Sequence, residues 1–400
     1  MSLPPELWIE IIKLATSVPS ELNTNAASLF ERCTHSEAHR MRSKILPTRR
    51  ALSRVSRSFH AMANPFLYQS ILIQRGGCLR RLAHTLRVTA DADKEAGTAH
   101  DHGGRGHGRW VKRFDVDFKK VRHWRKIPHE EIFWILSNMP NLEAFVAFGR
   151  DAPQVRGAMF ELISTQPLSD TLITYFPNPL ASEYSSYEED IESTKSYGFK
   201  DPTQARHLRA ITASDSWLRP RMASDPAYFP KLTTMHVYSS INPELVKTHG
   251  YKITTLDLEG CPWRMIAQYI HHMPNLASIL IDLIHAQPVT TTVAFALPNG
   301  FVLGSEFQIR TVRRVGLLVN AGQAPISTYN SAFEFLPKLF PNVKIIRLLE
   351  RDIIDQLVRL PQRVKRWHST LGERNIRLER EDGELLIHDC RDSQGQRRGN

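Results

Sequence analysis

Histidine side chains are the first residues of this chain to test for chemistry, because clustered imidazoles bind metal ions. Three of them lie in the glycine-rich segment 91–108, at His100, His102 and His107. The glycines of this segment argue against a preformed site. His271 and His272 precede an apolar segment and fit a helix surface better than a set of ligands. We therefore expect no metal site.

The cysteines and the short sequence motifs give no sign of an enzyme. The four cysteines are far apart and form no Cys-x-x-Cys pair: Cys33, Cys78, Cys261 and Cys390. This spacing favours reduced thiols in a core over a disulfide framework or a zinc site. The chain has no phosphate-binding loop, no Gly-x-Ser-x-Gly elbow and no His-Glu-x-x-His pair. We expect no catalytic residues and no cofactor.

The net charge of +11 comes from two basic stretches, at about residues 40–57 and 105–126. Such stretches attract acidic proteins or nucleic acid. Neither stretch has the aromatic and glycine pattern of a nucleic-acid module, so we interpret them as solvated faces and expect no nucleic-acid partner. No apolar run has the length of a membrane span, and the chain does not start like a signal peptide. We expect a protein of the cytoplasm, the nucleus or both.

Two helical patterns near the N-terminus are the strongest feature of the chain. Pro4 and Pro5 suit the first turn of a helix. After them, two apolar stripes at helical spacing cover most of the predicted helix, one of Leu7, Ile11 and Leu14, the other of Trp8, Ile12 and Ala15. A helix of this kind either packs into the core of its own chain or offers one side to a partner. Both interpretations are open from periodicity alone.

The second pattern begins at Leu52. Leu52, Val55, Phe59 and Met62 are spaced to share one face of a single helix. Asn64–Pro65 should end that helix, because the residue before a proline is disfavoured in helical conformation.

These two segments together resemble the two halves of an F-box, the helical module that docks on the Skp adaptor of SCF-type ubiquitin ligases. The first half reads Leu-Pro-x-Glu-Leu-x-x-x-Ile from Leu3 to Ile11, and the second places Val55, Ser56, Arg57, Phe59, Pro65 and Leu67–Tyr68 in the positions of that pattern. Ser56 stands where cysteine is common and Phe59 where tryptophan is common. The resemblance implies an adaptor-binding surface formed by Leu3, Pro4, Leu7, Ile11, Leu52, Val55, Phe59 and Leu67.

A short apolar pattern then recurs through the rest of the chain. It reads apolar-x-x-apolar-x-apolar, often after a proline, and Met-Pro-Asn-Leu precedes or opens it twice. Each copy predicts a short strand, and several follow a helical segment. The copies begin at Val111, Leu142, Leu208, Leu232, Ile253, Leu276, Val312 and Val343. The intervals of 21 and 23 residues around Ile253 equal one leucine-rich repeat.

The repeated unit resembles the divergent leucine-rich repeats that follow the F-box in many fungal F-box proteins. The resemblance implies an α/β fold: an N-terminal helical F-box followed by an irregular leucine-rich-repeat-like solenoid, with a curved parallel sheet and outer helices. An ordinary α/β domain of strand–helix units is the competing fold. Near the C-terminus, segments 376–380 and 384–388 flank Asp382–Gly383, which predicts a hairpin that caps the sheet edge.

The expected organisation has three parts. Residues 1–72 form the F-box, with an insertion at about 18–50 that holds one extra helix over 26–43. Residues 73–389 form the repeat domain, and residues 390–400 form a disordered tail.

Three functions follow as hypotheses. The first is a substrate-recognition subunit of an SCF-type ligase, which binds the Skp-family adaptor, and through it a cullin–RING ligase, with its F-box and an unidentified target protein with its repeats. The second is an interaction scaffold with a degenerate F-box that no longer binds the adaptor. The third is a nucleic-acid-binding protein that uses the basic stretches.

Overall fold

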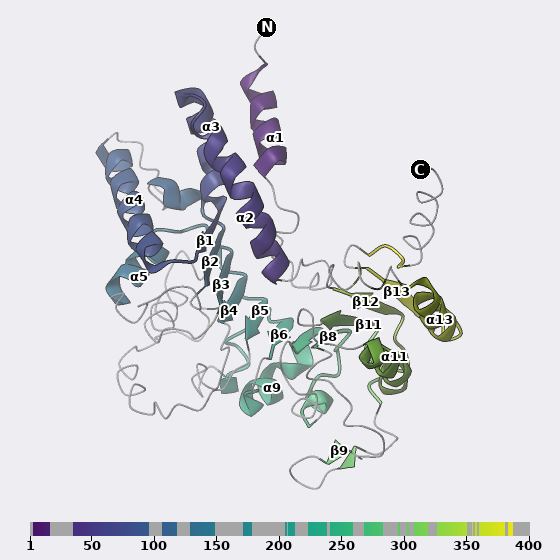
Figure 1. Cartoon of the computed structure of the whole chain (residues 1–400). Helices are drawn as coiled ribbons and strands as arrows, with labels where there is room; N and C mark the ends of the chain where they lie inside the picture. Colours follow the sequence, from purple (N-terminus) through teal and green to yellow (C-terminus); the bar gives the residue numbers. More distant parts are fainter. Residues whose placement is uncertain are drawn as a thin grey trace, which may run out of the picture. The chain divides into compact units, whose positions relative to one another are not determined.

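The structure is a computed structural model of the whole chain (Figure 1). It describes residues 3–16, 35–95, 106–117, 129–148, 171–177, 205, 207–212, 223–237, 241–258, 268–282, 295–296, 302–303, 308–318, 326–349, 354, 357, 360–380 and 383–386. Contacts divide the described residues into two compact units, one up to Leu232 and one from Thr233 onward. No helix in these ranges is long and apolar enough to cross a membrane.

Three helices open the first unit. They are α1 (Pro5–Thr16), α2 (His35–Leu52) and α3 (Arg57–Gln69), and each contacts the other two (Figure 1). The helix expected over 26–43 is therefore placed differently: α2 continues past Pro47 to Leu52, and residues 17–34 lie outside the described ranges.

The helix expected to carry Leu52 and Phe59 on one face is instead two helices. α2 ends at Leu52, Val55 lies in the turn that follows, and α3 begins at Arg57. The expected break at Asn64–Pro65 is also wrong, because α3 runs on to Gln69. Pro65 removes one backbone donor, but Ala63 and Asn64 are buried, so packing outweighs that local loss.

The first unit contains five parallel strands in chain order. They are β1 (Ser70–Ile73), β2 (Arg113–Asp117), β3 (Ala144–Phe148), β4 (Thr174–Pro177) and β5 (Ala210–Thr212). Between them lie α4 (Gly76–Glu95), the short 3-10 helix η2 (Gly106–Trp110) and α5 (His129–Ser137). α4 buries Leu79, Leu82 and Leu86, and α5 buries Ile135 and Leu136, so these helices supply one side of the core.

The second unit contains six parallel strands, again in chain order. They are β6 (Thr234–His236), β7 (Thr255–Leu258), β8 (Ser278–Asp282), β11 (Arg314–Leu318), β12 (Ile345–Leu348) and β13 (Arg377–Glu379). Its helices are α9 (Pro243–His249), η5 (Gly250–Lys252), η6 (Ile270–His272), α11 (Ile326–Leu339) and α13 (Pro361–Gly372). A two-residue pair, β9 (Phe295–Ala296) and β10 (Val302–Leu303), is antiparallel. The expected α/β class with parallel sheets is confirmed.

Every predicted strand is present, and each begins two residues into its apolar pattern. The pairing is in register: Arg113, Ala144 and Thr174, which occupy the same position of their patterns, pair across β2, β3 and β4. The second unit follows the same rule at Thr255, Ser278, Arg314 and Ile345. The repeated sequence is thus a repeated structural unit, whose first apolar residue is buried each time.

An asparagine joins neighbouring units at three of these turns. The side-chain Nδ2 of Asn141 donates to the carbonyl oxygen of Arg109 at 2.7 Å, that of Asn275 to Tyr251 at 2.6 Å, and that of Asn342 to Arg310 at 2.8 Å. Each asparagine directly precedes the first apolar residue of its own unit. Each accepting carbonyl belongs to the residue two positions before the first apolar residue of the preceding unit, as Arg109 is to Val111. The Pro-Asn of the sequence pattern therefore serves as a link between units.

The predicted C-terminal hairpin is present as far as the structure describes it. Gly383 has a left-handed φ of 90°, Arg380 N donates to Glu384 O at 2.8 Å, and Glu379 pairs antiparallel with Leu385. Because β13 is the last strand of its sheet, this return segment covers the sheet edge, as expected. The expected tail at 390–400 lies outside the described residues, and the boundary expected at residue 72 stays a prediction.

Candidate functional site

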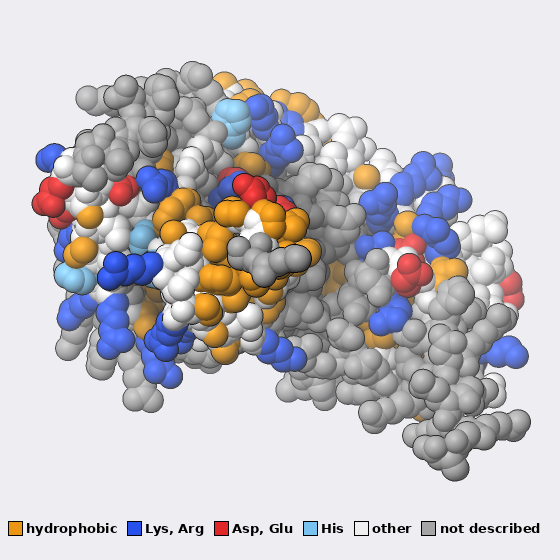
Figure 2. Space-filling model, turned by 90° about the horizontal axis from the view of Figure 1, so that it is seen from above, with side chains coloured by type: hydrophobic (Ala, Val, Ile, Leu, Met, Phe, Trp, Pro, Cys, Tyr) orange, Lys and Arg blue, Asp and Glu red, His pale blue; other side chains and the backbone are white. Residues whose placement is uncertain are grey.

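Exposed apolar side chains gather on the N-terminal helices. In the part of the chain that the structure describes, ten large hydrophobic residues are exposed, and seven of them lie between Leu3 and Val55: Leu3, Leu7, Ile9, Ile11, Leu14, Leu46 and Val55. Figure 2 shows orange hydrophobic side chains gathered on the face seen from above. Contiguous exposed apolar area of this kind marks an interaction site more often than a single exposed leucine does.

α1 buries only one narrow stripe of its surface. Ile12 and Thr16 are buried and Trp8 is half-buried, at spacings of four residues. The stripe expected from the sequence at Leu7, Ile11 and Leu14 is exposed, with Leu7 at 49% and Leu14 at 75%. Leu3 continues that stripe one turn earlier. An apolar helix face that the chain leaves uncovered is available to a partner; we call this set, Leu3, Leu7, Ile11 and Leu14, the α1 stripe.

Two contacts hold α1 in place against the other helices. The rings of Trp8 and Phe59 meet edge to face, with centroids 4.9 Å apart and planes at 63°. At the other end of α1, Arg49 of α2 is 6% exposed, and its Nε and Nη2 donate to the carbonyl oxygen of Thr16 at 3.0 and 2.7 Å. A guanidinium at the C-terminus of a helix satisfies an unpaired carbonyl and favours the helix dipole.

The turn between α2 and α3 is built by a helix cap. Ser56 is the N-cap of α3, and its hydroxyl accepts from Phe59 N at 3.1 Å. His60 Nδ1 lies 3.0 Å from Ser53 O in the same turn. Ser56 therefore has a clear structural role at the position where the resemblance leads one to expect cysteine. The cap leaves Val55, in the turn, 63% exposed.

The eight residues expected at the site fall into two groups. Leu3, Pro4, Leu7, Ile11 and Val55 are exposed, whereas Leu52, Phe59 and Leu67 are half-buried. Phe59 contacts α1 through Trp8, so the structure brings the two segments together. Leu52 and Val55 do not share a helix with Phe59, as described above.

Sequence reasoning missed some residues of this surface. Ile9 and Leu46 are exposed apolar residues that extend it, and helical spacing could not single them out. Arg49 was interpreted as part of a solvated basic face and is buried. Its neighbours fit that interpretation, since Lys44, Arg50, Arg54 and Arg57 are exposed. Leu46 and Val55 of the apolar surface therefore have exposed basic residues as near neighbours in the sequence.

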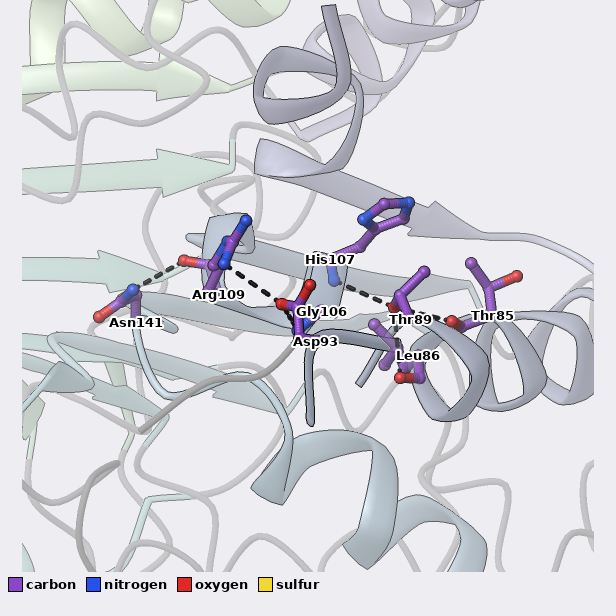
Figure 3. A network of polar contacts seen from close by, with 8 residues as sticks. All are labelled: Thr85, Leu86, Thr89, Asp93, Gly106, His107, Arg109 and Asn141. Atoms are coloured by element: carbon purple, nitrogen blue, oxygen red, sulfur yellow. Dashed lines mark hydrogen bonds and ion pairs between the residues drawn. The ribbon is translucent and has the colours of Figure 1, made fainter. Parts of the chain in front are cut away.

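A polar network ties α4 to η2, directly before β2 (Figure 3). Asp93 Oδ2 accepts from Gly106 N at 2.7 Å and from Arg109 Nη1 at 3.2 Å, and Thr89 Oγ1 accepts from His107 N at 3.1 Å. Asn141 extends the network to the next unit through Arg109 O. Gly106 has a φ of 67°, a conformation that favours glycine.

The imidazole of His107 packs against aromatic rings. Its centroid lies 4.4 Å from that of Tyr68 at the end of α3 and 5.0 Å from that of Trp110. Burial lowers the pKa of His107, and the charges of His60 and Arg109 lower it further against an opposite effect of Asp93. His100 and His102 lie outside the described residues. Within those residues no group of three His, Cys, Asp or Glu side chains could hold a metal ion.

Cys78 is the cysteine within the described ranges, and it is an exposed free thiol at the start of α4. The expectation of a core thiol is wrong at this position. The other three cysteines lie outside those ranges.

Comparison with models of known protein families finds no match for this chain, and comparison with curated proteins finds none either.

Proposed function

We propose that this protein is the substrate-recognition subunit of an SCF-type ubiquitin ligase, and that it binds a Skp-family adaptor through an F-box built from α1, α2 and α3. The observation that carries the proposal is the α1 stripe. The residues that match the first half of the F-box pattern, from Leu3 to Ile11, are the ones that the fold leaves exposed.

The contacts of α1 support a docking role. α1 is fixed at one end by Trp8 against Phe59 and at the other by Arg49 against Thr16 O. A helix that is anchored on one side presents its other side in one orientation, so a partner loses less entropy on binding. A specific interface of this kind buries roughly 1,600 Å² in total, and a few apolar anchors contribute most of the affinity. Leu7 and Ile11 are the central candidates for such anchors.

The charge beside the α1 stripe indicates the character of the partner. Lys44, Arg50, Arg54 and Arg57 are exposed, and basic side chains at the rim of an interface accelerate association with an acidic surface. We expect the adaptor to present apolar side chains with acidic groups around them, and we expect binding to slow as salt concentration rises.

We also propose that the parallel sheets belong to a divergent leucine-rich-repeat-like solenoid. The in-register strands and the asparagine links between units support this assignment, because such units bury their apolar faces only against their neighbours. The repeats would hold a target protein, and ubiquitin transfer would belong to the cullin–RING partner. The chain would itself perform no chemistry and would act in the cytoplasm, the nucleus or both.

A second candidate is an interaction scaffold that no longer binds the adaptor. The split between α2 and α3 favours it, because Leu52 and Val55 do not join Phe59 on one helix face. An adaptor that requires those three side chains on one helix face would not find that face here.

Co-expression with a Skp adaptor, followed by size-exclusion chromatography, separates the two candidates. The SCF proposal predicts that the wild-type chain co-elutes with the adaptor and that Leu7→Asp does not, because a charge at a buried anchor is costly. Val88→Asp is the matched control: Val88 is 52% exposed on α4, close to the 49% of Leu7, and lies outside the α1 stripe. A folded wild type that elutes alone would leave the scaffold as the better account.

A further inference from the structure

Three arginines lie on one face of the strands β11 to β13. Arg314 and Arg377 pair in register with Ile345 of β12 from either side, and Arg347 follows Ile345 by two residues. Side chains two residues apart on a strand share a face. Val315, Ile346 and Leu378 alternate with them and are buried in the core on the other face. Arg314, Arg347 and Arg377 therefore point to the same side of the sheet; we call them the arginine triad.

Glu379 holds two members of the triad. Its Oε2 accepts from Arg347 Nε at 3.1 Å and Nη2 at 2.7 Å, and its Oε1 lies 3.0 Å from Arg377 Nη2. The Glu379 side chain is only 3% exposed, whereas that of Arg377 is 62% exposed. A buried carboxylate that contacts two guanidiniums fixes their positions and leaves the outer one accessible, which is how a prearranged anion site is built.

Two glycines, Gly383 in the hairpin and Gly316 on β11, lie on either side of Arg347. A Cβ on Gly383 would lie 3.1 Å from Arg347 Nη2, so the turn rests directly on that guanidinium. On the other side of Arg347, the register places Gly316, which has no side chain to fill the space toward Arg314. The guanidiniums thus have little bulk between them.

The charge around the triad is positive. The buried carboxylate of Glu379 contacts two of the three guanidiniums, those of Arg347 and Arg377. Four further basic residues of the same strands and their turns are exposed: Arg310, Arg313, Lys344 and Arg374. Among the described residues of the adjoining segments, the exposed acids are Glu373 and Glu384. Within the residues that the structure describes, Arg313, Arg314 and Lys344 form no ion pair. An uncompensated basic surface attracts anions.

We propose that the arginine triad is a binding site for an oxyanion carried by a segment of a target protein, either a side-chain carboxylate or a phosphate. Planar guanidiniums recognise both groups through paired hydrogen bonds. Arg314 and Arg377 supply the accessible hydrogen-bond donors. The ion pair of Arg347 with Glu379 holds the site in a fixed geometry. This inference rests on the proposed function in taking the anion to belong to a target protein of the repeats.

A protein segment fits the site better than nucleic acid does. The triad is compact, since Arg314 and Arg377 lie two inter-strand spacings apart, roughly 10 Å, on either side of β12. The three strands present no aromatic side chain on this face on which a base could stack, and base stacking is the usual partner of a basic groove for single strands.

The test uses the full chain and four labelled probes of about ten units each: a glutamate-rich peptide, the same peptide with phosphoserine for glutamate, the same with glutamine, and a single-stranded DNA. Fluorescence anisotropy measures binding to wild type, to the double variant Arg314→Gln/Arg377→Gln, and to the control Arg363→Gln/Arg366→Gln, whose residues are exposed on α13. Arg347→Gln is avoided as the main test, because it would leave Glu379 buried with fewer partners.

We expect the glutamate or phosphoserine peptide to bind and the double variant to weaken that binding by about tenfold or more, as the loss of charge-assisted hydrogen bonds implies, with the control unchanged. Whichever of the two peptides binds identifies the source of the oxyanion. Equal binding of the glutamine peptide, an unaffected double variant, or tighter binding of DNA than of both acidic peptides would each overturn the proposal. Leu7→Asp should bind the peptide as wild type does, so loss of adaptor binding and loss of this site are separate results.

Discussion

At the scale of single residues, Arg49 decides how α1 is held. Its guanidinium is buried and donates twice to the last turn of α1 at Thr16 O, whereas Arg50 beside it is exposed. Arg49→Gln should cost about 1–3 kcal/mol of stability at this contact and loosen α1. Hydrogen exchange of the α1 amides should accelerate in Arg49→Gln and stay unchanged in the control Arg50→Gln. Equal exchange in both variants would contradict this role of Arg49.

His107 gives the folded state a pH dependence. Burial lowers the pKa of His107 in the folded state, so the unfolded chain, with a histidine pKa of about 6.5, binds a proton more readily. The stability contributed by neutral His107 is present above that value and is lost as the pH falls below it. His272 and His368, whose pKa values burial also lowers, act in the same direction.

His107→Phe isolates this effect, because phenylalanine keeps a ring against Tyr68 and Trp110 and does not titrate. Urea unfolding at about pH 7.5 and about pH 5 should show a larger loss of stability in wild type than in His107→Phe. His84→Phe, at an exposed position of α4, should behave like wild type. An identical pH dependence in wild type and His107→Phe would mean that protonation of His107 does not change the stability of the folded state.

At the scale of elements, the close approach of η2 to the turn after α5 should tolerate no side chain at Gly108. A Cβ on Gly108 would overlap the backbone carbonyl oxygen of Asn138, so Gly108→Ala should push these two backbone segments apart. We expect a loss of about 1–3 kcal/mol in the free energy of unfolding. Gly77→Ala is the control, because a Cβ there meets nothing within 4 Å and alanine favours the helix. Similar midpoints for the two variants would contradict the described packing.

Much of the strand arrangement could be predicted from sequence, because each strand and its turn lie within one short pattern. Leu142 and Leu276 follow the same Met-Pro-Asn and are buried in the same position. The strands β1 and β4 were missed, since no Met-Pro-Asn tripeptide precedes Ser70–Ile73 or Thr174–Pro177. The split between α2 and α3 could not be predicted, because spacing alone cannot show that Ser56 caps a new helix.

The candidate site could be predicted only in part. Helical spacing identified the stripe of Leu7, Ile11 and Leu14, but it left open whether the chain covers that stripe. Only the fold shows that α1 buries the opposite residues Ile12 and Thr16. The arginine triad was not foreseeable, because its members are at least 30 residues apart in the sequence and meet through strand register.

At the scale of the whole molecule, we propose that each of the two units carries one binding surface. The helices of the first unit offer the α1 stripe, and the strands β11 to β13 of the second offer the arginine triad. A subunit that selects targets needs both kinds of surface, and neither requires catalytic residues. The two surfaces should therefore fail independently when mutated.

Titration calorimetry of the purified full chain with a Skp adaptor measures whether the α1 stripe binds that adaptor, as we propose. We predict saturable binding by wild type and Val88→Asp, and a loss of about 2 kcal/mol or more in binding free energy for Leu7→Asp, the size expected of an interface anchor. Binding of Leu7→Asp with the affinity of wild type, or no binding by a folded wild type, would contradict the claim.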